Sequence, residues 1–245
     1  METEIVGGPR RLYLFQVGAG ELPREDAEPL QMSVGCYLVQ TDDHNVLIDS
    51  GTPGDVEMPG PFATEDSGDV IEHLASIGLQ PDDIDIVVSS HLDVDHIGHH
   101  DDFPAAEHVI QRSQYERARA GHPRFERGRS HWDHPSLRYR QVEGDSELLP
   151  GLELIQTDGH TVGHQSVLVR LPNTGPVLLA IDAVAMGSQF TPDRTQSPVD
   201  EDLETAIAST RRLLGLVERE QVGLTVFHHD GAQWATLRLA PEYYD

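Results

Sequence analysis

Six consecutive residues carry the strongest chemical signal in the sequence. The segment from His91 to His96 reads His-Leu-Asp-Val-Asp-His and directly follows the mostly apolar run from Ile84 to Val88. In an extended segment, the side chains at positions 91, 93 and 95 share one face, and Gly98 lets the chain turn sharply so that His96 can join them. On their own, these residues fit either half of a metal site or a solvated acidic turn with incidental histidines.

Other potential metal ligands also come just after apolar runs. They are His160, Asp182 and the adjacent pair His228 and His229. Residues at strand ends, held by a rigid sheet, can meet at one edge of that sheet. Imidazole and carboxylate donors in this number suffice for two divalent ions that share one bridging carboxylate. The predicted ligands are His91, Asp93, Asp95, His96, His160, Asp182 and one of His228 or His229.

Short apolar runs separated by polar turns must position these side chains. The predicted strands are Arg11 to Val17, Val34 to Gln40, Asn45 to Asp49, Ile84 to Ser89, His108 to Gln111, Leu152 to Thr157, Gln165 to Leu171, Val177 to Ile181 and Val222 to Phe227. Helical signals mark three segments: Asp66 to Gly78, Ser113 to Ala120, and Pro198 to about Glu220 with Ser197 as N-cap. The alternation of strand and helix indicates helices packed outside a sheet.

Two further segments leave alternatives open. Asp49 ends a predicted strand, where it either caps a turn or supports the metal site from behind a ligand. The stretch from Pro53 to Phe62 is rich in Gly and Pro and is predicted to be a surface loop bordering the site.

Composition limits the class of protein. A chain of 245 residues is most simply one domain, and a net charge of −25 argues against a nucleic-acid partner because acidic surfaces repel phosphates. The single cysteine, Cys36, excludes an intramolecular disulfide and is interpreted as a small core residue rather than a nucleophile. The sequence shows no targeting or membrane-spanning signal. We therefore expect a soluble, cytoplasmic protein without a membrane partner.

The segment from Arg112 to Arg140 contrasts with the acidic chain. It holds eight Arg against three acidic residues, a local charge of +5, together with scattered Gly and Pro. It is predicted to be an irregular, lid-like insertion at about 112–140 within a single domain, 1–245. It either docks on the acidic body through ion pairs or presents Arg and His side chains to an anionic or carbonyl-bearing substrate.

Taken in order, these motifs resemble the metallo-β-lactamase superfamily. Its hallmark is His-x-His-x-Asp-His, then a Gly-His pair, an Asp after a strand and a final His, matched here by Gly159-His160, Asp182 and His229. The sequence is most similar to the N-acyl homoserine lactonases and to related enzymes such as 4-pyridoxolactonase. The segments that carry this likeness are Leu47 to Gly51, Ile110 to Tyr115, Gly159 to Ser166, Ile181 to Ala183 and the pair His229-Asp230.

The resemblance implies an α+β fold, the αβ/βα sandwich of two sheets with helices outside. One ion would then be held by His91, Asp93 and His160, the other by Asp95, His96 and His229, and Asp182 would bridge them. Such quorum-quenching enzymes open a lactone with a hydroxide held between the metals, and Asp95 would carry the proton to the leaving oxygen. Zinc is the expected metal, the expected substrate is a small lactone or ester, and a homodimer is left open.

Two departures from the family pattern keep other functions under consideration. Asp93 stands where the family has His, and this harder oxygen donor would favour iron or manganese. It also resembles the carboxylate of flavodiiron proteins, so a di-iron oxidoreductase is one alternative, beside a thioester or phosphodiester hydrolase and a non-catalytic binding protein. Ala185 stands where quorum-quenching lactonases have a Tyr that contacts the substrate carbonyl. The metals or a donor from the lid-like insertion would have to replace that hydroxyl.

Overall fold

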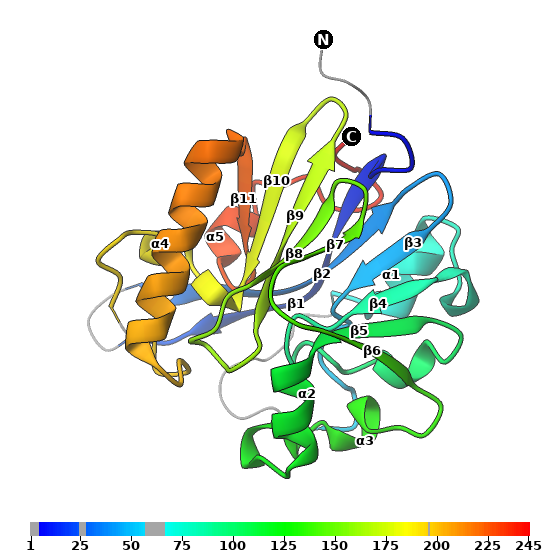
Figure 1. Ribbon diagram of the computed structural model, residues 1–245, viewed down its shortest axis with the longest axis horizontal. Coiled ribbons are helices and arrows are strands. Elements are labelled where there is room, and N and C mark those ends of the chain that lie inside the picture. Colours follow the sequence, from blue (N-terminus) through cyan, green and yellow to red (C-terminus); the bar gives the residue numbers. More distant parts are fainter. Residues whose placement is uncertain (1–4, 25–27, 57–66, 196) are drawn as a thin grey trace.

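The computed structural model describes residues 5–24, 28–56, 67–195 and 197–245. Two sheets pack face to face, and helices cover their outer faces (Figure 1). One sheet has the strand order β1-β2-β3-β4-β5-β6 and the other the order β11-β10-β9-β8-β7. The predicted αβ/βα sandwich is therefore confirmed. None of the described helices is long and apolar enough to cross a membrane.

The first sheet is antiparallel at one end and parallel at the other. Its strands are β1 (Arg11–Leu22), β2 (Leu30–Gln40), β3 (Asn45–Ile48), β4 (Ile86–Val88), β5 (Glu107–Gln111) and β6 (Arg138–Val142). Strands β1 to β3 pair antiparallel, whereas β3 to β6 pair parallel. Helix α1 (Val70–Ser76) buries Val70 and Leu74 against the outer face of this sheet. Helix α2 (Arg112–Arg119) follows β5 directly.

The second sheet is covered by the longest helix. Its strands are β7 (Ser146–Leu149), β8 (Leu152–Gln156), β9 (Gln165–Leu171), β10 (Gly175–Ile181) and β11 (Leu224–Phe227), with β10 and β11 parallel. Helix α4 (Leu203–Glu220) packs Leu213 and Leu216 against Leu168 and Leu178 on the outer face. A short helix, α5 (Gly231–Trp234), follows the last strand.

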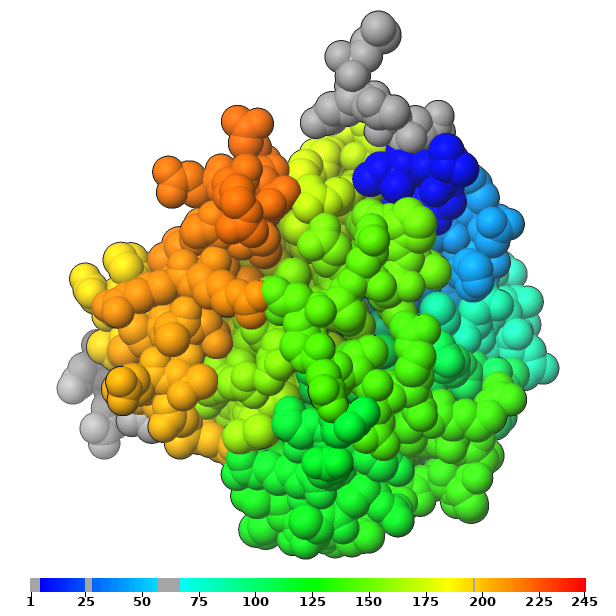
Figure 2. All heavy atoms as spheres, viewed as in Figure 1, coloured from blue at the N-terminus to red at the C-terminus, as the bar shows by residue number. Residues whose placement is uncertain are grey.

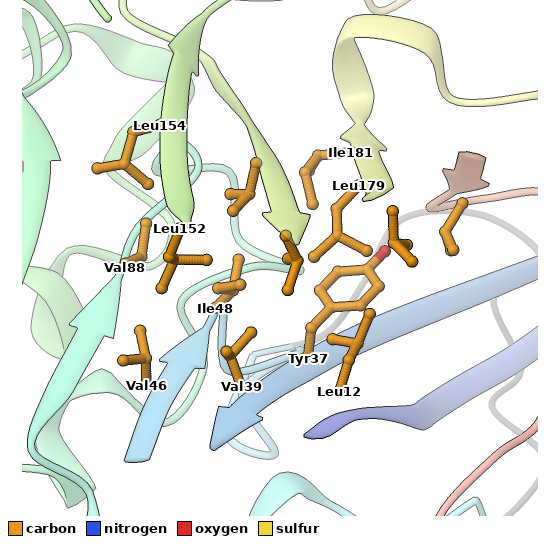
Figure 3. Packing of buried hydrophobic residues seen from close by; sticks show 14 of the residues in the cluster. Leu12, Tyr37, Val39, Val46, Ile48, Val88, Leu152, Leu154, Leu179 and Ile181 are labelled. Atoms are coloured by element: carbon orange, nitrogen blue, oxygen red, sulfur yellow. The ribbon is translucent and has the colours of Figure 1, made fainter. Parts of the chain in front are cut away.

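The inner faces of the two sheets form one apolar core. Side chains of Tyr37 and Val39 from the first sheet meet Leu179 and Ile181 from the second, and all four are fully buried (Figure 3). In β3, Val46 and Ile48 face this core while Leu47 faces the outer cluster with α1. Both faces of these strands are buried, so their sequences are continuous apolar runs rather than alternating ones. That continuity is why the central strands could be predicted.

Strands β6 and β7 were missed because they lack an apolar run. β6 lies at the edge of the first sheet and presents Arg138 and Arg140 to solvent, and β7 is a four-residue edge strand of the second. Edge strands are commonly short or charged. Their sequences therefore give little indication of their structure.

The start of α4 was placed too early. The helix begins at Leu203, and its N-cap is Asp202, which accepts a hydrogen bond from the backbone N–H of Thr205 at 2.6 Å. Ser197 instead donates its backbone N–H to Asp200, in a turn before the helix. The loop expected at 53–62 lies outside the described residues beyond Val56.

The basic segment at 112–140 consists largely of regular helices and a strand, so the expectation of an irregular cover was wrong. It contains α2, the 3₁₀ helix Pro123–Phe125, helix α3 (Arg129–Trp132) and the beginning of β6. Ala118, Phe125 and Trp132 are buried together with Leu92 and Ile97, so the segment packs directly on the chain around the first ligand motif. Its Gly and Pro residues lie at helix boundaries, which explains the misleading composition. The space-filling view shows the green segment as a continuous lobe on the lower part of this face (Figure 2).

Candidate metal centre

The predicted ligands meet at the carboxyl ends of strands from both sheets. His91 follows β4, Asp182 follows β10, and His229 lies two residues beyond the end of β11. The backbone at this edge is strained, because Asp49 and Ile181 have φ angles of 59° and 52°. Positive φ at residues other than Gly costs about 1–3 kcal/mol each and concentrates at functional sites.

Asp182 lies at the centre of the cluster. Its Oδ2 atom lies 3.2 Å from the Nε2 atom of His229, 3.4 Å from that of His160, 3.6 Å from that of His96 and 4.0 Å from that of His91. Two ligands bound tetrahedrally at about 2.1 Å to the same ion lie about 3.4 Å apart. The four separations suit a carboxylate that bridges two ions.

The remaining carboxylates divide the four imidazoles into two groups. Asp93 Oδ2 lies 3.3 Å from His91 Nε2 and 3.1 Å from His160 Nε2. Asp95 Oδ2 lies 3.8 Å from His96 Nε2 and 3.6 Å from His229 Nε2. The six other predicted ligands thus lie around Asp182, in the grouping that the family resemblance implied. Their coordination of metal remains a prediction.

Buried polar atoms in the cluster point to a metal ion. His91 Nε2, His96 Nε2 and Asp182 Oδ1 have no hydrogen-bonding partner among the described residues, although their residues are 0%, 0% and 4% exposed. Buried polar atoms are nearly always paired, so such atoms gathered at one point need an explanation. A cation bound between them would satisfy all three, and the site therefore fits divalent metal ions.

The opposite ring nitrogens of His91 and His229 are held by the protein. His91 Nδ1 lies 2.9 Å from Ser90 Oγ, and His229 Nδ1 lies 2.8 Å from the carbonyl oxygen of Ser33. Donation of the Nδ1 proton to an acceptor such as this carbonyl leaves the Nε2 lone pair for a metal. The rings are therefore oriented toward the centre of the cluster.

Asp49 supports the site rather than only capping a turn. It is fully buried, and its Oδ2 lies 2.9 Å from His96 Nδ1 and accepts from Ser90 Oγ at 2.7 Å. Its Oδ1 accepts the backbone N–H of Ser90 at 2.8 Å. The carboxylate therefore fixes the ring of His96 and the backbone that leads to His91.

Hydrogen bonds also distinguish His229 from His228 as the candidate ligand. His228 is fully buried, with Nδ1 3.3 Å from the hydroxyl of Tyr37 and Nε2 at 3.5 Å from the backbone N–H of Gly35. Burial, together with His96 and His229, lowers the pKa of His228 well below its ordinary value. Both of its ring nitrogens have partners within the protein, which favours His229 as the ligand.

His164 is a supporting residue that is not among the predicted ligands. Its Nε2 accepts the backbone N–H of Asp182 at 3.2 Å, and its Nδ1 lies 2.9 Å from Thr157 Oγ1. Burial lowers the pKa of His164 well below its ordinary value, and His91 and His160 lower it further. A neutral His164 therefore positions the backbone of the bridging carboxylate. The Gly-His pair at 163–164 was the available sequence signal.

The charged side chains around Asp182 shift one another's pKa. Burial alone would raise the pKa of Asp182, but His229, His96 and His160 lower it well below its usual range. Burial alone would lower the pKa of His160, but Asp182, Asp200 and Asp93 raise it to about 9. The site therefore stabilises cationic charge at its centre.

Arg124 is the second residue that the sequence did not single out. It comes from the basic segment, and its Nε and Nη2 donate to Asp93 Oδ1 and Oδ2 at 2.6 and 2.5 Å. Its Nη2 also lies 2.8 Å from His160 Nε2. Its contacts with Asp93 and His160 depend on tertiary packing. The only sign of Arg124 in the sequence was the local positive charge of the basic segment.

A family model described as the metallo-beta-lactamase superfamily matches residues 31–226. The chain belongs to this superfamily. It is 34% identical over 229 residues to an N-acyl homoserine lactonase of a Bacillus species, covering 88% of each chain. It is 32% identical to the N-acyl homoserine lactonase of Bacillus cereus, covering 96% of this chain and 98% of the relative.

Solved structures similar to this chain also include N-acyl homoserine lactone hydrolases. An N-acyl homoserine lactone hydrolase, with its product N-hexanoyl-L-homoserine bound at the catalytic metal centre, superposes with a TM-score of 0.84. It is 30% identical and covers 97% of this chain and 100% of its own. The predicted family, and the prediction of a dinuclear metal-dependent hydrolase of the lactonase type, are confirmed by these comparisons. The oxidoreductase and other hydrolase alternatives are not favoured.

Proposed function

We propose that this protein hydrolyses the ester bond of N-acyl homoserine lactones. The observation that carries this proposal is the convergence of four imidazoles on Asp182, in a chain whose relatives over nearly its whole length are N-acyl homoserine lactonases. One ion would be held by His91, Asp93 and His160, and the other by Asp95, His96 and His229. Asp182 would contact both ions.

Divalent ions in this site would supply Lewis acidity, which polarises a carbonyl and lowers the pKa of water toward neutrality. The chain itself supplies orientation and proton transfer. Asp49, Ser33 and Ser90 hold the ligand imidazoles, and His164 holds the backbone of Asp182. Such preorganisation avoids the cost of reorienting dipoles during the reaction.

Asp95 is the proposed proton carrier. Its side chain is 16% exposed, so it is reachable from solvent at the rim of a buried cluster, and its Oδ2 faces the imidazoles of His96 and His229. Ring opening converts the ester oxygen into an alcohol and therefore requires one proton. A carboxyl group at this position can deliver that proton to the leaving oxygen.

Recognition of the substrate carbonyl must differ from that in the quorum-quenching lactonases whose Tyr is replaced here. Ala185 offers no side-chain donor, and its carbonyl oxygen accepts the backbone N–H of His229. The basic segment brings one donor, Arg124, to the ligand cluster. We therefore propose that the lactone ring is polarised without a tyrosine hydroxyl.

The test is a pH-indicator assay on the purified protein with N-hexanoyl homoserine lactone, a γ-lactone lacking the amide, a thioester and a phosphodiester. We expect acid release only with the lactones, and a product heavier than the substrate by one water. Protein stripped by a chelator and reloaded with metal should lose and regain the activity. Turnover of the thioester or phosphodiester alone would refute the proposal.

Finer properties are proposed on chemical grounds. Four imidazole ligands suit zinc, whereas the carboxylate of Asp93 makes iron or manganese the alternatives. Elemental analysis of protein expressed without metal bias separates them. A cytoplasmic location accords with a chain that has one cysteine and no disulfide, and a homodimer would appear in light scattering.

A further inference from the structure

One arginine of the basic segment reaches into the first ligand group. Arg124 holds both oxygens of Asp93, and its Nη2 atom lies 2.8 Å from His160 Nε2. These are two of the three side chains proposed to bind the first ion. A single guanidinium nitrogen therefore lies where that ion would need to make its bonds.

We propose that Arg124 is an internal cation that competes with the first metal ion for Asp93 and His160. The two ions then bind in a fixed order, the second site filling first. This inference rests on the ligand assignment of the proposed function. In the second group, the ion pairs of Asp95 among the described residues are with His96 and His229, which are themselves proposed ligands.

The competition follows from the available lone pairs. His160 can offer a metal only one lone pair at Nε2, and the guanidinium Nη2 lies 2.8 Å from that atom, in the space that the ion would take. The contact between Arg124 and Asp93 is a bidentate, charge-assisted pair, which is among the stronger side-chain interactions. An ion entering the first site must displace both contacts.

The position of Arg124 is built into the fold. The next residue, Phe125, is 1% exposed, and its carbonyl oxygen accepts the indole N–H of Trp132 at 2.9 Å. The Nη1 atom of Arg124 donates to the carbonyl oxygen of Val199 at 2.9 Å. The backbone next to Arg124 is thus anchored, so release of Asp93 requires the side chain to rotate and to break its hydrogen bond to Val199.

An alternative partner for the guanidinium lies close by. The Oε1 atom of Glu201 is 3.9 Å from Arg124 Nη1, and its Oε2 atom pairs with Arg117 at 2.9 Å. Glu201 can therefore receive Arg124 when the first ion binds to Asp93. The basic segment thereby couples metal loading to its own ion pairs.

Titration of zinc into chelator-treated protein in a calorimeter tests the order in which the two ions bind. The wild type should show two steps, and Arg124→Gln should tighten the weaker step by about 10–100-fold, the range typical for residues that act on metal ligands. The stronger step should not change. Arg119→Gln is the matched control, since Arg119 also lies in the basic segment but pairs with Asp133, and it should leave both steps unchanged. Asp93→Asn identifies the weaker step by weakening it selectively.

Three results would overturn the inference: two equal steps in the wild type, an unchanged weaker step in Arg124→Gln, or a weaker step that becomes looser still. The last would mean that Arg124 orients Asp93 for the metal. If Arg124→Gln does not fold, Arg124→Met replaces it, because methionine keeps a long apolar side chain without the cation and should also tighten the weaker step. The readout is zinc affinity, so a failure of lactone turnover would refute the proposed function without affecting this result.

Discussion

Replacing Asp49 by Asn tests whether the residue behind His96 controls metal binding. The wild-type carboxylate has three partners, with His96 Nδ1 and Ser90 Oγ at Oδ2 and the backbone N–H of Ser90 at Oδ1. An amide of the same shape replaces one of these oxygens with an NH₂ donor. Neither orientation of that amide can keep all three hydrogen bonds.

Each orientation has a calculable cost. With the NH₂ group at the Oδ1 position, it faces the N–H of Ser90 and leaves a buried donor unpaired, which costs about 1–3 kcal/mol. With the NH₂ group at the Oδ2 position, His96 must accept at Nδ1 and carry its proton on Nε2, where the metal should bind. Changes of this kind reduce metal affinity about 10–100-fold, equivalent to about 1.4–2.7 kcal/mol. We therefore expect Asp49→Asn to lose stability, zinc affinity or both.

Zinc affinity is measured by competition with a chromophoric chelator, and stability by urea unfolding in the presence of excess chelator. Asp69→Ala is the control, because it removes the capping box of α1, about 1 kcal/mol, on the outer face of the first sheet. It should lower stability and leave zinc affinity unchanged. Wild-type affinity together with wild-type stability in Asp49→Asn would refute this account of the buried carboxylate.

Three further predictions concern stability. Gly159 has φ +127° and an added Cβ would lie 2.3 Å from the backbone nitrogen of Ala206, so Gly159→Ala should cost about 1–3 kcal/mol or more, and an unchanged urea midpoint would contradict this. Burial alone would lower the pKa of His131, but hydrogen bonds to Asp101 and Asp55 raise it. The stabilisation of the fold by protonated His131 should be complete below about pH 6.5 and be lost as pH rises through the raised pKa. His131→Asn should remove this dependence of Tm on pH. Removal of metal by a chelator should lower Tm, since ligand at 100 times its Kd stabilises by about 2.7 kcal/mol; identical melting curves would argue against metal binding.

The proposed ligand residues stand out in the sequence because they are polar residues in the loops that follow buried strands. The central strands are apolar on both faces, so runs such as Asn45 to Ile48 and Val177 to Ile181 were evident in the sequence. The edge strand β6 was not, because its arginines face solvent. Local chemistry therefore predicted the core and its strand ends, but not the boundary of the sheet.

Partners that come from distant parts of the chain could not be predicted in the same way. His164 acts on the backbone of a residue 18 positions away, and Arg124 contacts Asp93 across 31 positions. Nothing in the sequence near Asp93 shows that a guanidinium will pair with it. The Gly and Pro content of the basic segment even indicated irregular structure, whereas these residues lie at the boundaries of helices packed around Trp132.

The pairing of Asp93 with Arg124 changes the meaning of the aspartate in the metal motif. A histidine at this position would be a neutral ligand, whereas an aspartate adds one negative charge to a cluster that already holds Asp95 and Asp182. Arg124 balances that charge, so the pair as a whole is neutral, like the histidine it replaces. The site then has the same total charge as one with a histidine at position 93, because the guanidinium of Arg124 supplies one positive charge. Binding of the first ion is therefore an exchange of one cation for another. The guanidinium must leave Asp93 before the ion can bind there.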